Sequence, residues 1–263
     1  MNAEKVTNHI VEWLKDYATK AKVNGFVIGI SGGIDSAVTS TLCALTGLDL
    51  LCVEMPIHQG ENQVNRAKEH IDYLKRNYTN TTSIQTELTK TFISFTQAMP
   101  KIDASDTVDL SLANTRARLR MTTLYYLAGI HGLLVAGTGN KVEDFGIGFF
   151  TKYGDGGVDL SPIADLLKSQ VYELAKYLKT TPSIQNAAPT DGLFGDTRTD
   201  EDQIGASYDE LEWAMQMKEN GKKITDFNGR EAVVYAIFEA RHNANKHKMV
   251  AIPVCDIPKK YLI

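Results

Sequence analysis

A glycine pair flanked by two serines lies where an apolar segment gives way to a helical pattern. The segment consists of Gly29, Ile30, Ser31, Gly32, Gly33, Ile34, Asp35 and Ser36. Because glycine has no Cβ atom, the backbone at positions 32 and 33 can approach a phosphate group closely. The start of the following helix adds unpaired N–H donors and the positive end of a dipole, and the serines add hydroxyl donors. The segment therefore predicts a phosphate-binding loop.

Asp35 is the acidic residue of this segment and would repel a phosphate group on its own. A magnesium ion that bridges the carboxylate and the phosphate is the physical reason to expect an aspartate at this position. The loop is not a Walker A motif, because no Gly-Lys-Ser/Thr sequence follows, and it does not match GxGxxG either. A plain Gly-Gly turn, in which Asp35 and Ser36 only cap a helix, is the structural alternative.

The composition argues against several other kinds of protein. A net charge of −4 over 263 residues does not favour a nucleic-acid partner. The cysteines, Cys43, Cys52 and Cys255, are too far apart for a CxxC redox pair or a thiolate zinc site, and their odd number argues against a disulfide framework. No apolar run of about 18 residues and no signal-peptide pattern is present. We therefore expect no membrane span and a location in the cytoplasm.

Strand and helix patterns alternate over the first half of the chain. Short apolar runs predict buried strands, and apolar residues at helical spacing predict helices. The predicted strands cover 26–30, 50–55, 82–86 and 133–136, and the predicted helices cover 4–22, 35–45, 61–76, 88–99 and 109–131. This alternation is typical of an α/β fold, a Rossmann-like open parallel β-sheet with helices on both faces.

The second half of the chain reads as mostly helix and loop. Helices are predicted at 201–220 and 229–246, and the stretch 190–199, rich in Gly, Asp and Thr, predicts a loop. No linker-like segment divides the sequence. We therefore expect residues 1–263 to form a single domain with a helical C-terminal part.

Residues 31–36 resemble the SGGxDS loop of the N-type ATP pyrophosphatases, enzymes that cleave ATP between its α and β phosphates. Further segments, from about Tyr17 to Lys248, resemble the ammonia-dependent NAD synthetases of that superfamily. They are NTRARLRM at 114–121, GTGNKVE at 137–143 and FFTKYGDGGVD at 149–159, the last being the most specific to the family.

The resemblance implies how ATP would be bound. The loop at 29–36 would hold its phosphates. Three residues match further ATP-contacting positions of the family: Thr138, Lys168 and Thr190. Asp35 and Glu143 would bind Mg²⁺ between them, since both follow predicted strands.

The resemblance also assigns residues to a second substrate, nicotinic acid adenine dinucleotide (deamido-NAD). They are charged or aromatic and match substrate-contacting positions of the family: Tyr17, Arg118, Phe149, Lys152, Asp159, His247 and Lys248. Asp155 would lie near the incoming ammonia, where a carboxylate could accept a proton, and Lys168 would act with it in catalysis. Arg116 and Arg120 share a different face of the Arg118 helix, which we interpret as a solvated basic surface.

The activity implied by the resemblance is the amidation of deamido-NAD. Its carboxylate would attack the α-phosphate of ATP to give an acyl-adenylate and pyrophosphate, and ammonia would then displace AMP to give NAD. Because the phosphate loop starts by residue 29, we expect free ammonia rather than an attached glutamine amidase as the nitrogen source. Residues 191–205 match a loop that closes over the active site of the family, and the family forms homodimers, which we expect here.

Two departures from the family pattern and two other functions stay open. Glu54 stands where many members carry an arginine near ATP, and the stretch 143–152 is longer by one residue than in familiar bacterial members. Another ATP pyrophosphatase, such as a tRNA lysidine or thiolation enzyme, would usually carry a basic RNA-binding extension or paired cysteines, and neither is visible. A non-catalytic nucleotide sensor on the same fold would need no metal pair of Asp35 and Glu143.

Overall fold

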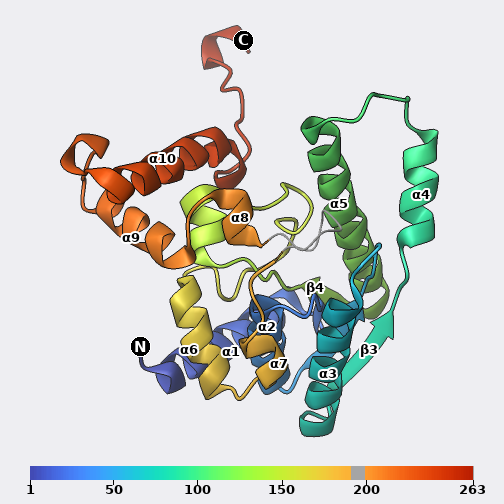
Figure 1. The fold of residues 1–263 in the computed structure, drawn as a ribbon. Helices are drawn as coiled ribbons and strands as arrows, with labels where there is room; N and C mark the ends of the chain where they lie inside the picture. Colours follow the sequence, from blue (N-terminus) through green and yellow to red (C-terminus); the bar gives the residue numbers. More distant parts are fainter. Residues whose placement is uncertain (191–198, 263) are drawn as a thin grey trace.

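A four-stranded parallel sheet lies at the centre of the computed structural model, which describes residues 1–190 and 199–262 (Figure 1). Its strands are β1 (Gly25–Gly29), β2 (Asp49–Glu54), β3 (Thr81–Gln85) and β4 (Leu133–Val135). Each end differs from its predicted position by no more than one residue. The agreement follows from the short apolar runs that form these strands, which are bounded by turn residues.

The strand order is β3-β2-β1-β4, so the chain adds strands on one side of β1 and then crosses to the other side. In an open parallel sheet such a reversal leaves a crevice at the C-terminal ends of the two strands that flank it, and ligands bind there. The flanking strands here are β1 and β4. The topology therefore brings together the residues that follow Gly29 and Val135.

Alternate residues along β1 face opposite sides of the sheet. Phe26 and Ile28 pack into one apolar core, and Val27 packs into another. The first core is covered by α1 (Ala3–Ala21), α2 (Ile34–Leu45), α3 (Glu61–Asn77), α6 (Lys168–Tyr177) and α7 (Pro182–Gln185). The second core is covered by α4 (Thr89–Ala98) and α5 (Asp106–His131). The predicted Rossmann-like sheet with helices on both faces is confirmed.

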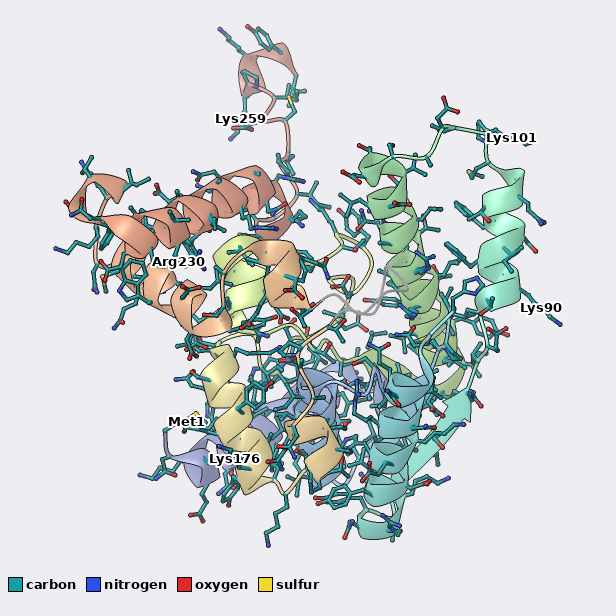
Figure 2. The ribbon with its side chains drawn as sticks, viewed as in Figure 1. Met1, Lys90, Lys101, Lys176, Arg230 and Lys259 are labelled. Atoms are coloured by element: carbon teal, nitrogen blue, oxygen red, sulfur yellow. The ribbon has the colours of Figure 1, made fainter. Side chains whose placement is uncertain are left out.

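The C-terminal part builds a third apolar core beside the sheet layers. Its elements are the π-helical turn η1 (Val142–Ile147), α8 (Asp200–Ile204), α9 (Tyr208–Glu219) and α10 (Gly229–Met249), and the 3₁₀ turn η2 (Ile224–Asp226) connects the last two. Beyond α10 an extended segment with a 3₁₀ turn, η3 (Lys259–Tyr261), projects away from the rest of the molecule, as the position of Lys259 in Figure 2 shows.

The predicted helix over 201–220 is divided in the structure into α8 and α9. Gly205 has a positive φ of 87°, the left-handed conformation that ends α8. Ser207 then caps α9: its hydroxyl accepts a hydrogen bond from the N–H of Glu210, whose carboxylate accepts one from the N–H of Ser207. The break places Tyr208 at the first turn of α9, where its hydroxyl reaches Glu143.

Cys43 and Cys52 are both buried in the apolar core, and burial raises the pKa of both thiols. Among the helices of residues 1–190 and 199–262, none is long and apolar enough to cross a membrane. The assignment of residues 1–263 to a single domain stays a prediction.

Candidate active site

The turn after β1 has the conformation that a phosphate-binding loop requires. Gly32 has a φ of 78°, and a Cβ atom there would lie 2.5 Å from the carbonyl oxygen of Gln63, so the position requires glycine. The Ser31 hydroxyl accepts a hydrogen bond from the N–H of Gly33, and the Ser36 hydroxyl donates one to the Gly33 carbonyl. Gly33 is the N-cap of α2 and offers no side-chain cap. The first N–H groups of α2 are therefore left available to an anion.

A buried lysine joins the two carboxylates that the sequence assigns to a metal. Lys168 Nζ lies 2.6 Å from Asp35 Oδ2 and 3.0 Å from Glu143 Oε1, and the lysine side chain is only 4% exposed. Burial alone would lower the pKa of Lys168, but Asp35 and Glu143 outweigh it and raise that pKa, so the amine stays protonated. The three side chains come from α6, α2 and η1, so only the folded chain brings them together.

Two side chains that the sequence analysis missed hold these carboxylates. The Asn140 amide donates to Asp35 Oδ1 at 3.1 Å, and its own oxygen accepts from the N–H groups of Val142 and Glu143. The Tyr208 hydroxyl donates to Glu143 Oε1 at 2.5 Å. Burial and the charge of Glu143 raise the pKa of Tyr208, so the phenol keeps the proton that it donates. Asn140 lies within the GTGNKVE motif, a signal that could have found it, whereas Tyr208 follows Glu143 only after 65 residues.

The centre fits a divalent cation on the chemistry of its donors. Carboxylate oxygens are the ligands that Mg²⁺ prefers, and the oxygens of Asp35 and Glu143 converge on one positively charged group, Lys168 Nζ. No cluster of three or more His, Cys, Asp and Glu side chains suited to a metal occurs in the described part of the chain. A magnesium ion at Asp35 and Glu143 would therefore need further ligands from phosphate oxygens or water.

The phosphate loop and the charged centre open into one pocket at the C-terminal ends of the strands. All residues assigned to ATP line it: Gly29, Ile30, Ser31, Gly32, Gly33, Ile34, Asp35, Ser36, Thr138, Lys168 and Thr190. Glu143 and Asp155 line the same pocket. Asp155 Oδ1 accepts a hydrogen bond from the N–H of Thr151 at 2.9 Å. The convergence follows from the topology, since the loop follows β1 and Thr138 follows β4.

The β2 side of the pocket carries polar residues that the sequence analysis did not assign to it. They are Glu54, Gln59, Gln63, Arg66 and Arg120. Arg66 Nε donates to the carbonyl of Gly32 at 3.1 Å and so ties α3 to the phosphate loop. Arg120 Nε donates to the carbonyl of Met55 at 3.0 Å, and its Nη2 donates to Gln59 Oε1 at 2.8 Å. These contacts brace the end of β2 against α5.

The interpretation of Arg116 and Arg120 as a solvated basic surface is wrong. Arg120 reaches the pocket, and the Arg116 guanidinium lies 4.3 Å from the centre of the Phe92 ring. Helical spacing shows which residues share a face, but it does not show which face the rest of the protein covers.

Asp144 is a further pocket residue without a sequence signal. A Cβ atom on Gly139 would lie 2.2 Å from both oxygens of the Asp144 carboxylate, so this glycine makes room for it. Burial raises the pKa of Asp144 to about 8, and the charges of Glu143, Asp155 and Asp35 add to the rise. At neutral pH the Asp144 side chain therefore holds a proton and adds no charge to the pocket.

The residues assigned to deamido-NAD are placed differently. Of these residues, all of which the structure describes, only Phe149 lines the pocket. Arg118 Nη2 donates to the carbonyl of Lys152 at 3.3 Å, and Lys152 Nζ donates to the carbonyl of His247 at 3.0 Å. Lys248 Nζ donates to two backbone carbonyls of the segment before Lys152. The three cationic side chains, those of Arg118, Lys152 and Lys248, therefore all donate to backbone carbonyls.

Asp159 and Tyr17 complete that set of assigned residues. Asp159 Oδ1 accepts from the Tyr125 hydroxyl at 3.0 Å, and its Oδ2 accepts from the N–H of Val135 at 2.8 Å. Tyr17 is 40% exposed on α1, with its ring centre 5.7 Å from that of Trp13. Within one chain Tyr17 does not meet the other assigned residues. The loop expected at 191–205 lies largely outside the described residues.

Comparisons with known proteins agree with this architecture. The NH(3)-dependent NAD(+) synthetase of Mesoplasma florum is 41% identical over 213 residues, which cover 81% of this chain and 84% of the relative. That of Methanosarcina mazei is 35% identical over 267 residues, 98% of this chain and 100% of the relative.

Two solved structures superpose closely. The NMN synthetase from Francisella tularensis has a TM-score of 0.83 and 31% identity and covers 98% of this chain and 100% of its own. The NH3-dependent NAD synthetase from Campylobacter jejuni has a TM-score of 0.77 and 25% identity, with 97% and 100% covered. The family model described as NAD synthase matches residues 6–251, and the chain therefore belongs to the NAD synthase family.

Proposed function

We propose that the chain is an ammonia-dependent NAD synthetase that uses ATP to amidate deamido-NAD. The observation that carries the proposal is the shared pocket, in which a phosphate-binding turn, the buried Lys168 centre and Asp155 face one another. Membership of the NAD synthase family supports the same reaction class, the formation of a C–N bond by a ligase.

The first step activates the substrate carboxylate. One of its oxygens attacks the α-phosphorus of ATP, and the bond from that phosphorus to the bridging oxygen breaks to release pyrophosphate. The N–H groups at the start of α2, with Ser31 and Ser36, would bind the phosphate oxygens. Lys168, which its carboxylate partners keep protonated, would offset the negative charge that develops on the leaving pyrophosphate.

The second step forms the amide. Ammonia attacks the acyl carbon, the bond to the AMP oxygen breaks, and the nitrogen loses a proton. Asp155 would accept that proton, held in place by the N–H of Thr151. Phe149, which lines the same pocket, would lie against the nicotinate ring. No covalent enzyme intermediate is needed, so the cysteines take no part.

The proposed cofactor is Mg²⁺, held by Asp35 and Glu143. When bound, it would neutralise phosphate charge and orient the phosphate groups for attack. Asn140 and Tyr208 would orient the two carboxylates toward the ion, since each donates a hydrogen bond to one of them. Replacing Asp35 by Asn or Glu143 by Gln should raise the Mg²⁺ concentration needed for half-maximal activity.

A homodimer is also part of the proposal. Three large apolar side chains of α5 are strongly exposed: Leu110 at 53%, Tyr126 at 68% and Ile130 at 58%. Tyr126 and Ile130 lie one helical turn apart and share a face, and exposed apolar side chains grouped in this way are typical of interaction sites. Arg118 and Tyr125, which contact other residues assigned to deamido-NAD, lie on the same helix. A second copy that covers α5 would therefore border the dinucleotide residues.

Nicotinic acid mononucleotide is a second candidate substrate. It is favoured by the close likeness to the Francisella NMN synthetase, at a TM-score of 0.83 and 31% identity. Its amidation would need the same pocket chemistry. We expect kcat/KM to be at least about tenfold higher for deamido-NAD, the gain that about 1.4 kcal/mol of extra binding provides. The opposite ratio would assign the chain to the mononucleotide.

The test of the proposed function is a steady-state assay with ATP, Mg²⁺, ammonium and deamido-NAD. The expected result is NAD formation that requires ammonium and is lost in Asp35→Ala and Glu143→Ala. Absence of NAD, together with equal ATP affinity in both variants, would instead identify a nucleotide sensor. The proposed setting is the cytoplasm, with residues 1–263 acting as one domain on free ammonia and with no nucleic-acid partner.

A further inference from the structure

Glu54 is a pocket carboxylate that the mechanism above does not use. It is the last residue of β2 and one of the residues that line the pocket, and its carboxylate interacts electrostatically with Lys68 and Asp72 of α3. Its Oε1 atom is buried and has no hydrogen-bond partner among the described residues. Buried polar atoms nearly always have a partner, so this oxygen lacks a donor that a ligand can supply.

The place of Glu54 in the sheet indicates which part of a nucleotide lies beside it. β1 and β2 are neighbours in register, Gly29 beside Val53, and the N–H of Ile30 donates to the Val53 carbonyl at 2.9 Å. The backbone of Glu54 therefore lies next to the first residues of the phosphate loop, at the spacing of about 4.8 Å that separates neighbouring strands. Thr138 follows β4 on the opposite side of the loop, and Lys168 contacts Glu143 of the segment after β4, so the outer phosphates would extend to that side. The β2 side then receives the sugar that is attached to the α-phosphate.

The other polar groups on the β2 side are already engaged. Arg66 and Arg120 donate to backbone carbonyls, and Gln59 Oε1 accepts from Arg120. Gln63 Oε1 accepts from the amide of Gln59 at 2.6 Å. Among the described side chains of this wall, Glu54 is the strong acceptor left for a ligand hydroxyl.

We infer that Glu54 is a specificity-determining residue that accepts hydrogen bonds from the 2′- and 3′-hydroxyls of the ATP ribose. An acidic residue at the end of the second strand, about 20 residues after a glycine-rich phosphate turn, has this role in other doubly wound sheets. The inference rests on the proposed function in taking ATP as the bound nucleotide.

Equilibrium titrations with ATP and 2′-deoxy-ATP test the inference. Wild-type protein should bind ATP about 10- to 100-fold more tightly than 2′-deoxy-ATP, the range expected for a hydrogen bond to a charged acceptor. Glu54→Ala should bind the two nucleotides within about twofold of each other, and Glu54→Gln should fall between. The matched control is Asp72→Asn, a carboxylate of α3 that acts on Glu54 electrostatically but does not line the pocket.

Full ribose selectivity in Glu54→Ala would overturn the inference, as would an equal loss in Asp72→Asn. Thermal melting of each variant checks that the fold is intact, and the conservative Glu54→Gln serves if the alanine variant unfolds. Deamido-NAD also carries ribose, so the KM of both substrates is measured. A rise confined to deamido-NAD would assign Glu54 to that substrate instead. Ribose-selective ATP binding without NAD formation would contradict the proposed function but leave Glu54 in its role.

Discussion

The pocket at the strand ends and the surface around residues 148–159 both gather charged side chains, but they partner those charges differently. In the pocket, Lys168 pairs with Asp35 and Glu143 in a centre with little exposure to solvent. On the surface, Arg118 and Lys152 donate to backbone carbonyls at 3.3 and 3.0 Å. The pocket charges form ion pairs with one another within one chain. The surface cations instead donate to backbone carbonyls, so they can still bind a negatively charged ligand.

This difference suggests that the two substrates are bound by different means. Charges that are already positioned in a water-poor pocket can act on a reaction without reorganising, which suits the ATP end of the chemistry. The charged residues on the surface are not enclosed in a pocket within one chain. The exposed apolar side chains of α5 lie on the helix that carries Arg118. Substitutions in the pocket should therefore reduce kcat in any assembly state. Substitutions on the surface should act on the dinucleotide KM.

The largest effect is expected from Lys168→Met. The change leaves Asp35 and Glu143 facing each other without their ammonium partner and removes a positive charge from the phosphate site. We expect kcat to fall by about a thousandfold, measured by NAD formation at saturating substrates. Lys141→Met is the matched control, because Lys141 pairs with surface carboxylates, and it should stay within about threefold. A Lys168 variant with a tenth of wild-type activity would mean that the pocket centre is structural.

The next largest effect is expected at the surface of α5 that a second copy of the chain is proposed to cover. Tyr126→Glu combined with Ile130→Glu places charges on the apolar face of α5 and should give a monomer by sedimentation. NAD formation should fall by at least about 30-fold, since interface anchors contribute 2 kcal/mol or more, while ATP affinity stays unchanged. Val233→Glu, at a 51% exposed site on α10, serves as the control. A parallel loss of ATP affinity would remove the distinction between the two regions.

A smaller and more selective effect is expected at Arg118. Arg118→Ala should raise the KM for deamido-NAD about tenfold and leave the KM for ATP unchanged, because a guanidinium bound to an anionic group contributes about 1.5–3 kcal/mol. Arg116→Ala on the same helix loses its contact with Phe92 and should affect thermal stability rather than either KM. Equal changes in both KM values for Arg118→Ala would contradict its placement on the dinucleotide side.

The smallest effect is a pH dependence of stability at Asp144. Its pKa is about 8 in the folded protein against an ordinary value of 3.8, so between these values the folded chain holds a proton that the unfolded chain has lost. The contribution of this group to stability is therefore full at low pH and is lost as the pH rises toward 8. Asp144→Asn avoids the loss. Its advantage in the free energy of unfolding should grow by about 1.4 kcal/mol for each pH unit between pH 5 and pH 7.

Denaturant unfolding at several pH values measures that advantage. Asp165→Asn, at a carboxylate whose side chain is 98% exposed, is the control and should show no such trend. A difference between Asp144→Asn and wild type that is constant with pH would show that Asp144 keeps an ordinary pKa in the folded chain.

The strands were predictable because each is a short apolar run, and the phosphate loop was visible because its glycines are consecutive. The same reasoning failed at Gly205, whose left-handed conformation divides a helix that periodicity alone made continuous. Arg120 was missed because helical spacing does not reveal which face meets the sheet. Tyr208 was missed because its contact with Glu143 spans 65 residues and depends on how α9 packs. Local patterns thus predicted the elements, while long-range contacts decided which side chains meet.

The most direct test of the proposed reaction follows one oxygen atom. Deamido-NAD labelled with ¹⁸O in its nicotinate carboxylate is incubated with the protein, ATP, Mg²⁺ and ammonium, and the products are analysed by mass spectrometry. Attack of the carboxylate on the α-phosphate predicts NAD, pyrophosphate and AMP that carries one labelled oxygen. Unlabelled AMP, or ADP and phosphate in place of AMP and pyrophosphate, would contradict activation through an acyl-adenylate in this pocket.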